Sequence, residues 1–110
     1  MSKNNLKIET IISILELIKK YIAVPETNLK HSIFDTKEDI INELNNHILK
    51  LKIEDFSKIE DLIILFSPTS DLQEISLDSG WGKKFLEISE NFDLAIKDLI
   101  EEFDLKPFSN

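Results

Sequence analysis

The chain lacks cysteine and arginine and has very little glycine, proline or tryptophan. Its 110 residues include no Cys, two Gly, three Pro and one Trp. The absence of a thiolate excludes a disulfide framework, a zinc ribbon, a thiol redox centre and a cysteine nucleophile. The absence of arginine removes the side chain that reads bases in a bidentate manner, which argues against recognition of nucleic acid.

Long hydrophobic runs are missing as well. The longest unbroken run is Leu62 to Phe66, and charged side chains interrupt the apolar residues between Leu6 and Ile22. A signal-peptide core or a membrane span needs a longer run than this. We therefore expect a soluble, cytoplasmic protein that does not enter a membrane. The heavy use of Ile, Asn and Lys without Arg is typical of an AT-rich genome, such as that of a bacterium or phage.

Positive charge is scarce, because 13 Lys stand against 21 acidic residues and leave a net charge of −8. The acidity lies in residues 35–110, whereas residues 1–34 carry a slight excess of Lys. Nucleic-acid binding needs clustered cations, so no nucleic-acid partner is expected. A negative field attracts basic proteins and repels anionic membranes, although it also serves plain solubility.

Apolar residues recur at helical spacing along most of the chain, which predicts an all-α fold. We expect residues 1–110 to form a single-domain antiparallel bundle of four main helices, with a short irregular segment before the last helix. The four helices are predicted at about residues 4–22, 37–52, 57–66 and 83–105.

Capping residues and apolar stripes support these helices. Asp35 and Thr36 precede the second helix as N-cap candidates, and Ser57 opens a capping-box pattern for the third. His47 falls on the apolar stripe of the second helix, where a place at the edge of the core is favoured over a metal ligand. The predicted stripes are Leu6, Ile8, Ile11, Ile12, Leu15, Ile18 and Ile22, then Ile40, Leu44, Ile48 and Leu51, then Phe85, Ile88, Phe92, Ala95, Leu99 and Phe103.

The segment 67–82 is the least regular part of the sequence. Its apolar residues Leu72, Ile75 and Leu77 fit either a brief strand or a short helix, and periodicity does not choose between them. We favour a short helix capped by Ser70, with Gln73 three residues later.

Catalytic and metal-binding patterns are absent from the sequence. His31 and His47 lie too far apart for a His-x-x-x-His metal site, and residues 80–82, a Gly-x-Gly, lack the rest of a phosphate-binding fingerprint. Asp71, Glu74 and Asp78 lie near Trp81, and a carboxylate pair beside an aromatic ring is one arrangement used for acid and base chemistry. A solvated loop is the better interpretation. We expect no catalytic residues, no metal and no cofactor.

The last predicted helix carries the most informative pattern. At 100° per residue, one stripe of spacing three, four, four, three lies opposite the apolar side and places one leucine among four acids. This pattern is typical of an interface anchor inside a charged rim, and the alternative is a solvated face with a stray leucine. The residues of this stripe are Glu87, Glu90, Leu94, Asp98 and Glu101.

Trp81 is a second candidate anchor, because Trp is the residue type most enriched at binding hot spots. Asp78 beside it completes the predicted partner-binding set. The alternative, slightly favoured, is that Trp81 closes one end of the core.

Composition and pattern together favour a non-catalytic protein that binds and neutralises a basic protein. Examples of this class are an immunity protein against a bacterial toxin or nuclease and a phage-type inhibitor. The main alternative is a structural or regulatory adaptor, or a homo-oligomeric helical subunit that docks through its Phe-rich last helix. A small enzyme using Asp71, Glu74 or Asp78 is a third hypothesis.

Overall fold

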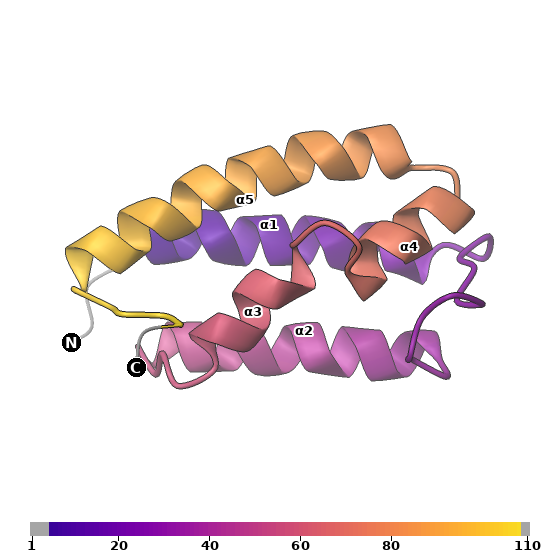
Figure 1. Cartoon of the computed structure of the whole chain (residues 1–110). Coiled ribbons are helices and arrows are strands. Elements are labelled where there is room, and N and C mark those ends of the chain that lie inside the picture. Colours follow the sequence, from indigo (N-terminus) through magenta and orange to yellow (C-terminus); the bar gives the residue numbers. More distant parts are fainter. Residues whose placement is uncertain (1–4, 109–110) are drawn as a thin grey trace.

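The described part of the chain, residues 5–108, folds into five helices and contains no strand in this computed structural model (Figure 1). The all-α prediction is therefore confirmed. The segment expected to be irregular contains one additional short helix, on which Leu72 and Ile75 are buried. The short helix favoured over a strand for this segment is thus confirmed. The helices are α1 (Leu6–Ala23), α2 (Lys37–Lys52), α3 (Ile59–Leu65), α4 (Asp71–Asp78) and α5 (Gly82–Glu102).

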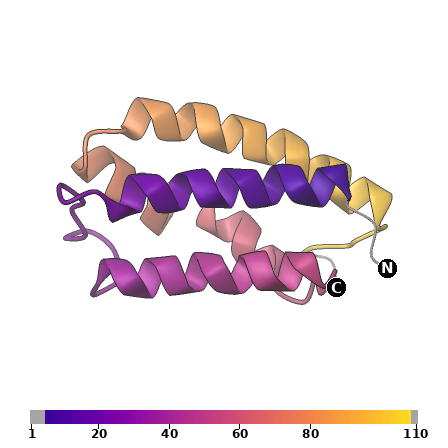
Figure 2. The ribbon, with the colours of Figure 1, turned by 180° about the vertical axis from the view of Figure 1, so that it is seen from behind.

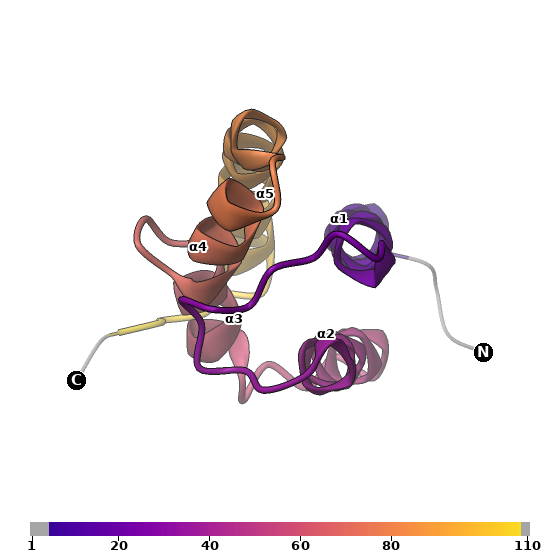
Figure 3. The same cartoon turned by 90° about the vertical axis from the view of Figure 1, so that its right-hand side faces the viewer.

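Three long helices and two short ones form two layers. α1 lies between α2 and α5 and runs antiparallel to both (Figures 1 and 2). Seen end-on, α1 and α2 form one side of the molecule, and α3, α4 and α5 form the other (Figure 3). The short helices α3 and α4 lead the chain back along the molecule from the end of α2 to the start of α5 (Figure 1).

The core lies between the two layers. In α2, the whole predicted stripe is buried, His47 included, which confirms both the helix and the face. Phe66 at the end of α3 stacks on Phe92 of α5 with ring centroids 4.0 Å apart, and this aromatic contact joins two elements of the same layer. The fully buried large side chains are Phe85, Phe92, Ile11, Leu15, Ile18, Ile22, Ile40, Leu44, Leu62, Leu72, Ile75 and Leu99.

Most helix starts agree with the predicted caps, and one does not. The Thr36 hydroxyl accepts a hydrogen bond from the backbone N–H of Asp39, and the Ser70 hydroxyl accepts one from Gln73. The capping box at Ser57 is wrong, because α3 begins only at Ile59. The Ser57 backbone N–H instead donates to Asp55 Oδ1 in the preceding turn.

The ends of the outer helices also differ from the prediction. The predicted start at Asn4 lies outside the described residues, and the Asn5 side chain caps α1. α5 ends at Glu102 and not at Leu105, because Asp104 adopts a left-handed φ of 52° that stops the helix. Leu6 was expected in the core, but its side chain is 80% exposed at the first turn of α1.

Candidate functional site

The predicted stripe lies together on the outer face of α5. Glu87, Glu90, Asp98 and Glu101 are all exposed, and Leu94 between them is 67% exposed. The buried side of the same helix carries the core residues Phe85, Ile88, Phe92, Ala95, Ile96 and Leu99. Because 3.6 residues make one turn, burying that side forces this stripe toward solvent. We name these five residues the acidic stripe.

Three carboxylates of the acidic stripe have no salt-bridge partner within the described residues: those of Glu90, Asp98 and Glu101. Glu87 has only a long contact with Lys84, at 3.6 Å. Repulsion between neighbouring carboxylates costs each pair a few tenths of a kcal/mol, and no cation of the described chain lies within salt-bridge distance of these three.

Glu102 is used differently from its neighbours. It lies beside the acidic stripe but reaches across to the start of α1, where the Asn5 side chain donates to it and Lys7 pairs with it at 3.1 Å. The Asn5 hydrogen bond, followed by the Lys7 interaction, holds the pKa of Glu102 below its usual value. This carboxylate helps to join α1 to α5, whereas Glu90, Asp98 and Glu101 form no salt bridge with any residue that the structure describes.

The charge order along α5 opposes the helix dipole. Lys83 and Lys84 lie in the first turn and Glu101 and Glu102 in the last, with no acid in the first turn and no base in the last. A helix is stabilised by acids at its N-terminus and bases at its C-terminus. The acids of the last turn of α5 are therefore not placed to stabilise the helix.

A shallow groove runs beside the acidic stripe, between α1 and α5. It has a volume of about 480 Å³, and Leu17 of α1 and Leu94 of α5 contribute its exposed apolar walls. Ala95 lies at its base and is 8% exposed. Small side chains at Ser13 and Ala95 leave this space open, since larger ones at these positions would fill it.

The groove continues toward the start of α1. A smaller hollow of about 110 Å³ adjoins it, sharing Thr10, Ala95 and Asp98, and Leu6 lines its far end. The exposed Leu6 that the sequence analysis assigned to the core is thus part of this groove. The one usable signal in the sequence was the spacing of Leu6, Ser13 and Leu17, which at 100° per residue share one side of α1, away from its buried stripe.

Trp81 lies in the core and is 8% exposed, which is the placement that the sequence analysis slightly favoured. Its ring stacks on Tyr21 of α1 with centroids 4.6 Å apart. Its backbone N–H donates to the carbonyl of Ser76, across a turn in which Gly80 has a φ of 90°. This is the Schellman arrangement that ends α4, and it directs the indole inward. Trp81 is therefore not part of the exposed face of α5.

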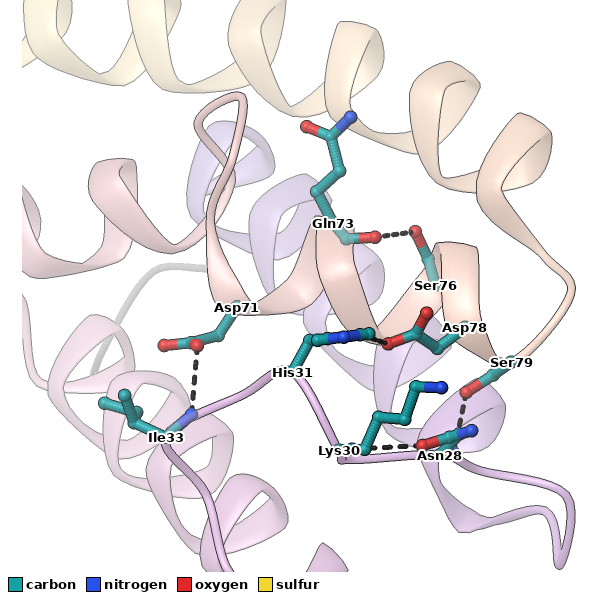
Figure 4. Close-up of polar contacts among 9 residues, drawn as sticks. All are labelled: Asn28, Lys30, His31, Ile33, Asp71, Gln73, Ser76, Asp78 and Ser79. Carbon is teal, nitrogen blue, oxygen red and sulfur yellow. Dashed lines mark hydrogen bonds and ion pairs between the residues drawn. The ribbon is translucent and has the colours of Figure 1, made fainter.

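Asp78 lies on α4, beside a loop and not within the acidic stripe. Its Oδ2 lies 2.7 Å from Nδ1 of His31, and Asp71 on the same helix accepts a hydrogen bond from the backbone N–H of Ile33 at 3.1 Å (Figure 4). The Ser79 hydroxyl accepts a third bond, from the Asn28 backbone. These contacts hold the loop between α1 and α2 against α4. Two of the three carboxylates that the enzyme hypothesis would use, those of Asp71 and Asp78, are thus engaged in the fold.

His47 is 3% exposed on the core side of α2, and its Nε2 lies 3.0 Å from Glu43. Burial lowers the pKa of His47, and the adjacent Glu43 carboxylate opposes this shift. The core placement predicted for His47 is confirmed. Among residues 5–108, no three His, Cys, Asp or Glu side chains gather in a way that would hold a metal ion.

The fold and this face together define a class: an all-helical bundle with an exposed acidic stripe beside an apolar groove. Of the helices that the structure describes, none is long and apolar enough to span a membrane. No protein-family model, curated protein or solved structure matches the chain.

Proposed function

We propose that this chain is a non-catalytic binding protein that neutralises a basic protein through the acidic stripe of α5. The observation that carries the proposal is Leu94, 67% exposed and surrounded by four carboxylates, of which only Glu87 has a salt-bridge partner in the described chain. An exposed apolar anchor supplies desolvated contact area, and the charges around it steer a partner of opposite sign.

The charge order of α5 supports the same proposal. Acids in the last turn of a helix oppose its dipole and reduce its stability. A basic partner would compensate this repulsion, because each Lys or Arg that it places against Glu90, Asp98 or Glu101 supplies the missing counter-charge. The partner class is therefore a protein with a cationic surface, such as a toxin or nuclease whose nucleic-acid site is positive.

A protein of this kind acts where its target would do harm. We propose the cytoplasm of a bacterium, or of a phage-infected bacterium, as its location, and the role of an immunity protein or phage-type inhibitor. Nucleic acid is not a proposed ligand, because the stripe and the net charge of −8 both repel phosphate.

Affinity capture from a lysate of the source cell tests the proposal, with elution in salt steps and identification by mass spectrometry. The wild-type chain is expected to retain one basic protein that salt releases, because screening at physiological ionic strength and above weakens steering charges. Leu94→Arg and Glu90→Lys are expected to lose that protein and to unfold at the same temperature as the wild type.

Two matched substitutions provide the controls. Glu26→Lys makes the same charge change in the exposed loop after α1, and Leu49→Arg makes the same apolar-to-basic change at a 62% exposed site on α2. Both controls should retain the partner. Equal retention of the partner by all four variants would reject the acidic stripe as the partner-binding face. Recovery of the chain alone, or of partners that resist salt, would favour the homo-oligomeric or adaptor alternative.

A further inference from the structure

The groove between α1 and α5 has the shape and the chemistry of a binding site for one helix. Its floor and walls are mostly apolar, with Leu17 on one side, Leu94 on the other and Ala95 at the base. Together with the adjoining hollow at Leu6, it follows the antiparallel pair of α1 and α5, which run side by side in Figures 1 and 2. From Leu6 to Leu17 the α1 wall extends roughly 16 Å, about three helical turns.

The two walls of the groove differ in charge. The α1 wall presents the small hydroxyl residues Thr10 and Ser13 and, at the adjoining hollow, Lys7, whose charge is paired with Glu102. The α5 wall presents Asp98, an acid without a salt-bridge partner in the described chain. The rest of the acidic stripe continues along that same side. An occupant would therefore need an apolar face for the floor, cations on one flank and small or uncharged residues on the other.

We infer that the groove binds a single amphipathic basic helix of the partner protein, about three turns long, with its Lys or Arg flank against α5. This inference rests on the proposed function and specifies the part of the partner that is recognised. Helix-in-groove binding uses apolar anchors spaced three and four residues apart on the bound helix, and Leu6, Leu17 and Leu94 offer exposed apolar contacts for such anchors. Charge complementarity with Asp98 and the acidic stripe selects a basic helix.

A second copy of this chain is the less favourable occupant. Each copy carries a net charge of −8, and the exposed face of α5 would set carboxylates against carboxylates. Like charges placed opposite each other suppress such contacts. The inferred complex is therefore between this chain and a cationic helix, and the isolated chain is expected to be a monomer.

Filling the groove without changing its charge tests the inference. Ser13→Phe places a ring in the space between α1 and α5, and Ser13 is exposed, so the fold is expected to be retained. Asn46→Phe adds the same ring to an exposed position on α2 and is the matched control. Asp98→Asn removes charge from the α5 wall and leaves the groove open.

The probe is a synthetic helical peptide of about 14 residues, with leucines on one face and lysines on one flank. Two further peptides serve as controls: a shuffled one of the same composition and one with glutamates in place of the lysines. Titration calorimetry gives the affinity, and amide chemical shifts locate the contact. We expect saturable binding of the lysine peptide alone, with shifts along α1 and α5.

Ser13→Phe should weaken that binding at least tenfold and Asp98→Asn severalfold, whereas Asn46→Phe should leave it unchanged. Absence of saturable binding to the wild type would overturn the inference, as would equal binding of the lysine and shuffled peptides or full binding by Ser13→Phe. Capture of a partner from the lysate by the wild-type chain and by Ser13→Phe, but not by Glu90→Lys, would support the proposed function and reject the groove as the binding site. Peptide binding in the groove, with no basic protein captured, would instead reject the proposed function.

Discussion

The helices α2 and α5 are both long, both amphipathic and both neighbours of α1, yet their charges are arranged in opposite ways. α2 has Glu38 and Asp39 in its first turn and Lys50 and Lys52 in its last, as the helix dipole favours. α5 has lysines at its start and glutamates at its end. Apart from Lys37 at its first residue, the end charges of α2 stabilise the helix that carries them, and those of α5 do not.

The same contrast separates the carboxylates of α4 from those of α5. Asp71 and Asp78 bind the loop between α1 and α2, whereas Glu90, Asp98 and Glu101 have no counter-ion in the described chain. Acid residues of one chemical type thus fall into two groups, one engaged in the fold and one facing solvent. Only the second group is available to a partner, which is why the proposed function rests on α5.

The largest expected effect is the difference between these two groups. Asp71→Ala combined with Asp78→Ala should lower the free energy of unfolding by about 1–2 kcal/mol, because both loop contacts are lost. Asp98→Ala combined with Glu101→Ala should change it by no more than about 0.5 kcal/mol, or raise it. Urea denaturation measures both. Equal losses in the two double variants would contradict the division into fold-engaged and free carboxylates.

Exchanging end charges tests the contrast between α2 and α5 without altering the net charge. Glu38→Lys with Lys52→Glu should destabilise the protein by about 1 kcal/mol, because both charges then oppose the dipole of α2. Lys83→Glu with Glu101→Lys in α5 should stabilise it by somewhat less, because a new repulsion with Glu87 subtracts a few tenths of a kcal/mol. Chemical unfolding curves give the sign of each change in stability. Destabilisation by the α5 exchange would contradict the conclusion that the end charges of α5 oppose its dipole.

The C-terminal caps of the two helices provide a smaller test. α2 and α5 are each followed by a non-glycine residue with left-handed φ, Glu54 at 54° and Asp104 at 52°. Glu54→Gly should raise stability by about 0.5–1 kcal/mol, since Gly adopts this conformation without strain. Asp104→Gly should raise stability by a smaller amount, because Asp tolerates the left-handed region better than Glu. Thermal melts rank the two variants, and the reverse order would show that neighbouring contacts outweigh the backbone term.

The smallest expected effect is a pH dependence centred on His47 of α2. Burial lowers its folded pKa below the ordinary 6.5, and Glu43 partly offsets this. The unfolded chain therefore binds the proton more readily, so stability is present above pH 6.5 and falls as the pH drops below that value. His47→Gln should reduce the slope of melting temperature against pH between 8 and 5. An unchanged slope would assign the dependence to other groups.

Sequence periodicity predicted the helices and most of the core correctly. The α2 stripe, the inward Phe85 and Phe92, and the outward Leu94 all follow from counting 3.6 residues per turn. Leu6 was misplaced because the stripe was drawn too wide: at 100° per residue Leu6 lies about 150° from the centre of the buried residues of α1. Ser57 was misread as a cap because Asp55 competes for its backbone N–H, a contact made by the turn and not by the helix.

The sequence by itself determined that this chain forms amphipathic helices, which faces they bury and where the acids of α5 lie along that helix. The hydrophobic effect fixes these features locally, since each helix must turn its apolar stripe inward. Only the tertiary structure decided that His31 and Ile33 meet Asp78 and Asp71, and that α1 and α5 leave a groove between them. Those features depend on packing between residues far apart in the chain, and the periodicity of one helix carries no information about the distance to another.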